Sequence, residues 1–432
     1  MMHAASEDGT DAETAASLRE PAQASPWYVL ATLHGEQYST NIDKSLHELN
    51  RRSWNRWVAS ALSNETKTHL AKVCGVNPDD LVALSHEEQA SLATKLQQRL
   101  STDAVSTAAF ASPDATASIE FANREFNLAF AADGFIMLGE ADFSGSRFRR
   151  QALFSGAVFI RGARFERARF EDRTWFARTI FSDRADFTGA KFLDEAIFYR
   201  SKFERSARFG RTSFKSTTIF NRACWKRSPD FRDATLPFCT TWHEVSWPRT
   251  PADKDNAALA VEHYAALRHA MDAAKRHDVE IEFFIRELSA RARVRSWPER
   301  FAIRAYLLLS KGGLSFIRPF LMWVSALAGM IPITFGAITK RTPLIDAPTD
   351  LTNQDIAAAV EAGRLAIGSA VVVAAPFLDT RRLEQIESRL SEIGAFGVVP
   401  VWLQALSLLH AGFSGLCLFL MALALRNWLR VR

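Results

Sequence analysis

The sequence predicts a mixed fold, in which a β-solenoid is preceded by a small α-helical segment and followed by transmembrane helices. Three observations support this prediction. A small residue two positions before a large apolar one recurs from Ala141 to Leu236, at steps that alternate between five and six residues. Apolar residues follow helical spacing through much of residues 43–101. Two long uncharged runs lie near the C-terminus.

The large positions of the repeat are almost all phenylalanine. Of the eighteen small positions, seventeen are Ala, Ser or Thr. Side chains two residues apart on a strand share one face, so each unit is expected to send a small and a large side chain inward. The predicted solenoid core consists of Phe143, Phe148, Phe154, Phe159, Phe165, Phe170, Phe176, Phe181, Phe187, Phe192, Phe198, Phe203, Phe209, Phe214 and Phe220.

The alternation of five and six residues limits the size of one coil. Coils that stack in register must contain an even number of units, and two units would leave no interior for the phenylalanine rings. Four units, or 22 residues, are therefore predicted for each coil. Neighbouring coils would pair backbone to backbone at a spacing of about 4.8 Å.

This pattern resembles the pentapeptide-repeat family, whose motif places a small residue two positions before a central Leu or Phe. The resemblance implies a right-handed quadrilateral β-helix. The sixth residue in every second unit departs from the family pattern and makes an eleven-residue super-repeat. The whole layout resembles the membrane-anchored bacterial type of this family, which implies an inner-membrane location but no agreed activity.

Five segments are expected along the chain. In chain order, the segments are a disordered tail (1–25), a small α-helical segment with a linker (26–118), the solenoid with its caps (119–248), amphipathic basic helices (249–315) and a membrane domain (316–432). Within the second segment, Pro26–Gly35 is expected to be a short extended or docking segment. Ser85 and Glu88 form a capping box there, which predicts a helix through Leu100.

Two transmembrane spans are predicted near residues 319–339 and 400–425. The uncharged runs are Pro319 to Thr339, with 21 residues, and Ala395 to Leu425, with 31. Both can cross a hydrocarbon core of about 30 Å. The apolar run 365–378 is too short to span untilted, and is expected to be a re-entrant or interfacial segment, or a helix packed on the other two.

The charges around the spans predict the topology. The stretch before the first span and the C-terminal tail are rich in arginine, whereas residues 340–394 carry six basic and eight acidic residues. The positive-inside rule therefore places the solenoid and both termini in the cytoplasm of a multi-pass bacterial inner-membrane protein. The basic helices before the first span are expected to attract anionic lipid head groups.

The sequence contains no recognisable catalytic or metal-binding motif. Phosphate-binding, nucleophile-elbow, dinucleotide-binding and zinc-protease signatures are absent, and the four cysteines are isolated from one another. No enzymatic activity, cofactor or metal is therefore expected. Nucleic-acid binding is disfavoured, because the 21 basic residues from Glu140 to Asp233 are interleaved with 12 acidic ones.

Two functions are compatible with this sequence. The favoured one is a membrane-anchored scaffold whose solenoid presents an Arg-rich surface, with Arg164, Arg169 and Arg208 as candidates, to an unknown protein partner. The alternative is an oligomeric two-span channel-like or transport protein regulated by the solenoid, although the run 365–378 lacks a recognisable filter. Gln404 and His410 form a candidate intramembrane polar site.

Overall fold

The computed structural model describes residues 19–39, 41–102, 114–251, 253–339, 353–374, 388 and 401–431. Contacts divide the chain into two compact units, Met1–Val294 and Arg295–Arg432. The first unit contains the solenoid and the helices that cap it. The second contains the helices that are apolar enough to cross a membrane.

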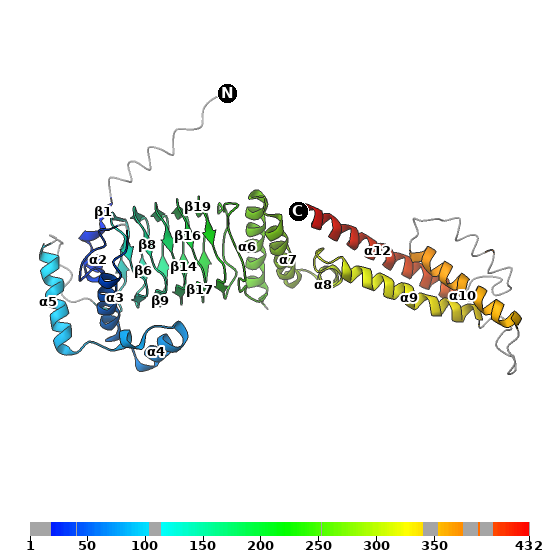
Figure 1. Cartoon of the computed structure of the whole chain (residues 1–432), viewed down its shortest axis with the longest axis horizontal. Coiled ribbons are helices and arrows are strands. Elements are labelled where there is room, and N and C mark those ends of the chain that lie inside the picture. Colours follow the sequence, from blue (N-terminus) through cyan, green and yellow to red (C-terminus); the bar gives the residue numbers. More distant parts are fainter. Residues whose placement is uncertain are drawn as a thin grey trace, which may run out of the picture. The chain divides into compact units, whose positions relative to one another are not determined.

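A four-sided parallel β-solenoid forms the centre of the first unit (Figure 1). Its four sheets are called here the basic sheet, the ladder sheet, the stripe sheet and the covered sheet. The basic sheet contains β1 (Glu20–Pro21), β3 (Arg124–Phe126), β7 (Arg147–Phe148), β11 (Arg169–Phe170), β15 (Lys191–Phe192) and β19 (Ser213–Phe214). The ladder sheet contains β2 (Ile119–Glu120), β6 (Ala141–Asp142), β10 (Ala163–Arg164), β14 (Ala185–Asp186) and β18 (Ala207–Arg208).

The other two sheets complete each coil. The stripe sheet contains β4 (Phe130–Ala131), β8 (Ala152–Leu153), β12 (Thr174–Trp175), β16 (Ala196–Ile197) and β20 (Thr218–Ile219). The covered sheet contains β5 (Ile136–Met137), β9 (Val158–Phe159), β13 (Ile180–Phe181), β17 (Lys202–Phe203) and β21 (Cys224–Trp225). The predicted solenoid with four sides is confirmed.

The strands pair in parallel with strands one coil away. Ala163 lies opposite Ala185, an offset of 22 residues, as predicted for a coil of four units. This register places equivalent positions of successive coils directly above one another. Each inward or outward position therefore becomes a column that runs along the solenoid.

Stacked aromatic rings fill the interior of the solenoid. The ring of Phe165 lies 4.9 Å from the rings of both Phe143 and Phe187, with the planes within 4° of parallel. Edge-to-face contacts join neighbouring columns, as between Phe165 and Phe176 at 5.3 Å. The fifteen predicted core phenylalanines are at most 1% exposed. Burial of each such side chain contributes roughly 1.5–3 kcal/mol.

The corners of the solenoid follow directly from the local sequence. Each five-residue step turns through a residue two positions after the large one, in the left-handed region. At Arg167 φ is 56°, and the amide of Ala168 donates to the carbonyl of Phe165 at 3.1 Å. These corner residues recur every eleven positions: Asn123, Gly134, Gly145, Gly156, Arg167, Arg178, Gly189, Arg200, Arg211, Arg222, Asp233 and Glu244.

The N-terminal end of the stack is capped by residues that were expected to be disordered or extended. β1 pairs with β3, and Arg19 Nε donates to the carbonyl of Gly145 at 2.9 Å, so the prediction of disorder is wrong for residues 19–25. Residues 1–18 lie outside the described part. Pairing at the end of the basic sheet satisfies an otherwise open edge, which composition alone does not reveal.

Helix α2 (Pro26–Ala31) lies across the first coil, where an extended or docking segment was expected. The ring of Tyr28 lies 6.0 Å from that of Phe126 and 6.1 Å from that of Phe130. The short 3-10 helix η1 (Ala22–Ala24) precedes it. Packing against the solenoid stabilises this six-residue helix, which would be marginal alone.

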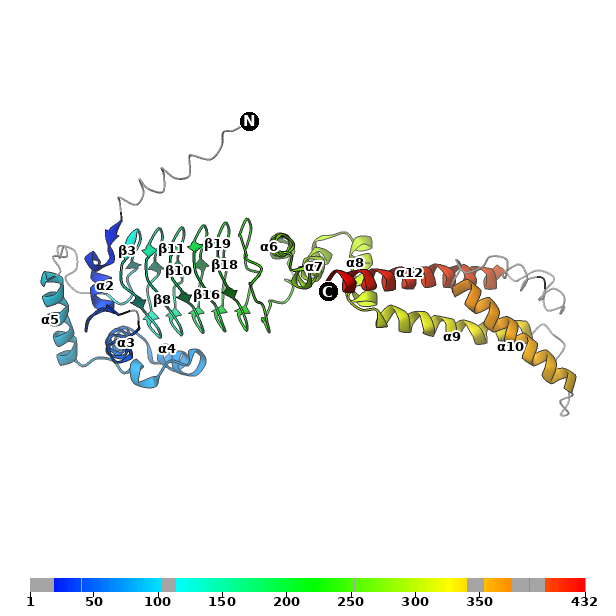
Figure 2. The ribbon, with the colours of Figure 1, turned by 45° about the horizontal axis from the view of Figure 1, so that its top comes forward.

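The remaining N-terminal helices are α3 (Lys44–Ala59), α4 (Asn64–His69), η2 (Leu70–Cys74), η3 (Pro78–Leu81) and α5 (His86–Thr102). Trp54 Nε1 donates to the carbonyl of Ile136 at 2.8 Å. The outward side chains of Val158 and Ile180 are at most 6% exposed, and α4 lies beside the solenoid (Figures 1 and 2). The predicted capping box is confirmed: Ser85 N donates to Glu88 Oε2 at 2.8 Å, and Glu88 N to Ser85 Oγ at 3.2 Å.

Two helices, α6 (Lys254–Ala273) and α7 (His277–Val294), close the C-terminal end of the solenoid (Figure 1). The ring of Phe283 meets those of Trp242 at 5.7 Å and Trp247 at 5.2 Å, both edge to face. The segment predicted as 249–315 is therefore divided. α6 and α7 belong with the solenoid, whereas α8 (Trp297–Ser310) belongs to the second unit.

The second unit contains two helices long and apolar enough to cross a membrane, Ile317–Ala337 within α9 (Ile317–Thr339) and Val401–Leu429 within α12 (Val401–Val431). Helix α10 (Asn353–Ala374) packs against both through a buried cluster of Met330, Ala370 and Leu403. The described part of the run 365–378 is thus the second half of a 22-residue helix rather than a short separate segment. Residues 375–378 lie outside the described part.

Candidate interaction surfaces

The outward column of the ladder sheet alternates in charge from Asp142 to Asp230. Arg164 lies 3.3 Å from Asp142 of the coil before, and Arg208 lies 3.5 Å from Asp186. Unlike charges stacked on neighbouring strands stabilise a sheet by roughly 0.2–1 kcal/mol a pair. The column reads Glu120, Asp142, Arg164, Asp186, Arg208 and Asp230.

The three arginines predicted to face a partner are already engaged in these pairs. Arg164 also lies 3.1 Å from Glu140, and Arg169 lies 2.9 Å from Glu171. Arg164 and Arg208 share the ladder sheet, two coils apart, but Arg169 lies on the adjacent basic sheet. For Arg164 and Arg208 the sequence could not distinguish these pairs from free cations, because partners one coil apart are separated by about 22 residues.

Asp186 is the most buried member of the charged column, with a side chain 2% exposed. Burial alone would raise its pKa, but hydrogen bonds outweigh it. Thr188 Oγ1 and Arg184 Nη2 each donate to the carboxylate at 2.5 Å, and the pKa of Asp186 is lowered. Asp186 therefore remains ionised and holds its neighbours in place.

The stripe sheet presents an outward column of apolar side chains. Leu153 is 8% exposed, and Trp175, Ile197 and Ile219 are partly exposed. They lie in register, since Trp175 pairs with Leu153 and Ile197, and Ile197 with Ile219. Sequence reasoning missed this stripe, although a large apolar residue directly before every fourth core phenylalanine was a visible signal.

Between the stripe sheet and the covered sheet, the left-handed corner carries arginine in three successive coils. This arginine corner consists of Arg178, Arg200 and Arg222, with φ between 57° and 59°. Arg200 lies 5.3 Å from the ring centre of Tyr199, and Arg222 is paired with Glu244 at 2.6 Å. Gly134 and Gly156 occupy the same corner in earlier coils. Arginine is therefore not needed there by the backbone, which glycine would fit at lower cost.

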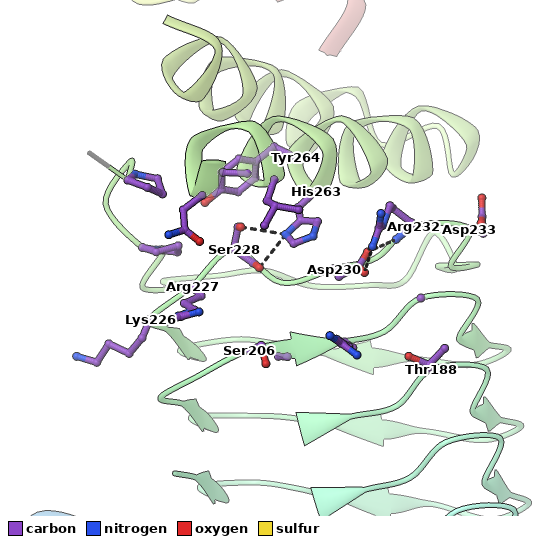
Figure 3. Close-up of a pocket in the computed structure, with 18 of the residues that line it drawn as sticks. Thr188, Ser206, Lys226, Arg227, Ser228, Asp230, Arg232, Asp233, His263 and Tyr264 are labelled. Carbon is purple, nitrogen blue, oxygen red and sulfur yellow. Dashed lines mark hydrogen bonds and ion pairs between the residues drawn. The ribbon is translucent and has the colours of Figure 1, made fainter. Parts of the chain in front are cut away.

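A polar groove of about 960 Å³ lies between α6 and the last coils of the ladder sheet (Figure 3). Arg208 is paired with Asp186, and Arg232 with Asp230 at 2.7 Å. The other four cations of the groove have no ion pair among the residues that the structure describes. The six cations that line it are Arg208, Arg211, Lys226, Arg227, Arg232 and Arg249.

His263 of α6 lies beside Ser228 in this groove but does not form a Ser–His nucleophile pair (Figure 3). Its Nδ1 lies 3.0 Å from both the hydroxyl and the carbonyl oxygen of Ser228. A carbonyl only accepts, so Nδ1 carries the proton and cannot take one from the hydroxyl. Burial lowers the pKa of His263, partly offset by Asp230. The imidazole is therefore a neutral structural donor.

One cluster of metal-binding residue types flanks the turn between α6 and α7, with Asp272 near the end of α6 and His277 and Glu280 in the first turn of α7. Ligand atoms of Asp272, His277 and Glu280 are within 4.8 Å of one another. His277 Nδ1 is 3.1 Å from Glu280 and 3.7 Å from Asp272. The three could coordinate a divalent cation, but a hydrogen bond between the His277 imidazole and the Glu280 carboxylate accounts for the same arrangement.

The two polar residues predicted inside the second span do not face the same way. Gln404 is exposed, whereas His410 is 7% exposed. A separation of six residues places them about 120° apart around a helix. The structure of α12 therefore separates these candidates, and their role as an intramembrane site stays a prediction.

Comparison with known proteins identifies the repeat. Residues 132–180 match the family described as pentapeptide repeats (9 copies), and the match falls within the solenoid. No curated protein and no solved structure matches the chain. The matched segment lies within the stacked four-sided coils and carries the predicted small and large positions. Residues 132–180 of the solenoid are therefore pentapeptide repeats.

Proposed function

We propose that this protein is a scaffold of the bacterial inner membrane, whose cytoplasmic solenoid binds a protein partner. The apolar helices Ile317–Ala337 and Val401–Leu429 would anchor it. The observation that carries the proposal is the apolar column of the stripe sheet beside the arginine corner. Because buried aromatic side chains fill the interior of the solenoid, a partner would bind to its outer surface.

Complementarity defines the chemistry of the partner. Trp175, Ile197 and Ile219 offer a straight line of partly exposed apolar side chains at successive coils. The arginine corner runs parallel to this line and places positive charge along one side. The partner is therefore a protein surface whose apolar side chains are flanked on one side by carboxylates.

This surface is preferred to the predicted Arg164, Arg169 and Arg208. Each of those arginines already has a carboxylate within 3.5 Å. A partner would have to break these pairs and leave carboxylates unpaired, which reduces the net gain. Arg178 has no ion pair among the described residues, so a carboxylate can approach it without that loss.

A photo-crosslinking residue at Ile197, compared with one at Arg164, tests the surface in cells. The expected result is an adduct from position 197 that disappears with Arg178→Glu and Arg200→Glu together. The crosslinked peptide of the partner should contain apolar residues next to Asp or Glu, and the purified partner should bind the full chain. Equal adducts from both positions, or adducts that survive the double substitution, would reject the proposed surface.

A measurement of ion flux distinguishes the channel function from the scaffold function. Full-length protein inserted into liposomes should conduct no better than empty vesicles if it is a scaffold. Flux that depends on residues 365–374 would instead support an oligomeric pore.

A further inference from the structure

The groove between α6 and the last coils has an excess of positive charge. At several other places on the solenoid, arginines pair with carboxylates of neighbouring coils. In the groove, Arg211, Lys226, Arg227 and Arg249 have no such partner among the described residues. Asp233 is the one lining carboxylate not paired with a cation in the described part, whereas Asp230 is held by Arg232. Four cations against one acid leave an excess of three positive charges.

Two of these cations, Arg227 and Arg249, follow one spacing of the repeat. Asp183, Arg205 and Arg227 lie 22 residues apart in successive coils, and Arg249 continues this spacing beyond the last strand. The first corner has an aspartate that accepts its neighbour's amide, from Arg184 at 2.8 Å. The next two positions, Arg205 and Arg227, carry arginine instead and lie in register on neighbouring coils. Like charges in register on neighbouring strands are destabilising, so this arrangement is costly unless an anion lies beside it.

We infer that this groove binds a compact polyphosphate anion, either free or as a phosphorylated lipid head group. An excess of three positive charges exceeds what one carboxylate neutralises, and guanidinium groups bind phosphate oxygens in pairs. The groove volume of about 960 Å³ is ample for a ligand of that size. Ser206 and Ser228 offer hydroxyl groups beside the cations (Figure 3).

The site is built on rigid elements. Ser228 and Asp230 follow the last strand of the covered sheet and are held by His263 and Arg232, respectively. Asp230 is 8% exposed, and hydrogen bonds from Arg232 anchor it. The backbone that carries the cations is therefore rigid, and binding of a ligand requires little rearrangement of it.

Isothermal titration of tripolyphosphate into the full chain, held in phosphatidylcholine nanodiscs, tests the inference. One saturable site is expected, with affinity that falls as salt rises. Arg227→Ala with Arg249→Ala should weaken binding about a hundredfold, since each charge-assisted hydrogen bond is worth about tenfold or more. The matched control is Arg150→Ala with Lys215→Ala, which removes two exposed cations that do not line the groove.

A second arm separates the two sources of phosphate. Vesicles that contain phosphatidic acid are added, and their capture of the nanodiscs is measured with and without tripolyphosphate. Capture that tripolyphosphate abolishes and that the groove variant lacks assigns the site to a lipid head group. Tripolyphosphate binding without vesicle capture assigns it to a soluble ligand. No binding in either arm, or equal losses in the groove and control variants, overturns the inference.

Discussion

Phe176 lies in the middle of the solenoid and has a parallel ring on either side along the stack. Its centre is 5.0 Å from those of both Phe154 and Phe198. Edge-to-face contacts reach Phe165 and Phe187, which belong to another column. Loss of one ring therefore disturbs several contacts at once and leaves a space that rigid neighbouring coils cannot fill.

We expect Phe176→Ala to lower the free energy of unfolding by about 3–5 kcal/mol. Chemical denaturation followed by far-ultraviolet circular dichroism measures this change. Phe176→Leu should cost clearly less, because it retains more of the buried volume. Equal stability of both variants and the wild type would show that the ring columns do not limit stability.

Asp186 predicts how acid affects the solenoid. Its pKa is lowered by hydrogen bonds from Thr188 and Arg184, against the opposing effect of burial. A carboxyl with a lowered folded pKa stabilises the protein above its unfolded pKa, about 3.9. That contribution is lost as the pH falls through the folded pKa.

Asp186→Asn should therefore destabilise the solenoid at pH 7 and flatten the loss of stability below about pH 4. Thermal unfolding across a pH series checks both effects. An unchanged acid limb, with the same stability at pH 7, would mean that the carboxylate is not coupled to folding.

At the scale of elements, the left-handed corners separate a structural requirement from a functional one. Four of the corners carry glycine and five carry arginine. A non-glycine residue in this conformation costs roughly 1–2 kcal/mol. The arginines persist despite this cost, which agrees with a role for their charge on the surface.

We expect Arg178→Gly to raise the free energy of unfolding by about 1 kcal/mol, and Arg178→Val to lower it. Arg150→Gly is the matched control, because Arg150 lies at a corner without positive φ. There glycine should destabilise by about 0.5–1 kcal/mol. The same sign at both positions, read from denaturation midpoints, would contradict this account of the corners.

The elements differ in how far the sequence predicted them. The strands of the solenoid were predictable because the small and large positions recur at regular steps. All strand pairs then have the same offset of one coil. Helix α2 was not, since Pro26–Ala31 carries too few residues for a helical period. Its burial against Phe126 and Phe130 is a contact between segments about 100 residues apart.

At the scale of the whole molecule, the two apolar helices predict a membrane protein, and the arginine-rich flanks of the spans predict that its solenoid faces the cytoplasm. Cys239, in the last coil, is exposed and gives a direct probe of this topology. A variant that retains Cys239 alone should react with a membrane-impermeant maleimide in inside-out vesicles but not in right-side-out vesicles. Reaction in right-side-out vesicles would place the solenoid outside, and release of the protein by carbonate would exclude anchoring by the helices.

The sequence by itself determined the solenoid, its 22-residue coil and its phenylalanine core, because these depend on period and polarity alone. It also predicted the two apolar helices, whose length and composition are local properties. The tertiary structure decided which charges are paired. Arg164 and Arg227 look alike in the sequence, yet Arg164 has two carboxylates within 3.3 Å and Arg227 lines a groove. The difference arises because ion pairs depend on distance in space, and stacking brings together residues that are a full coil apart.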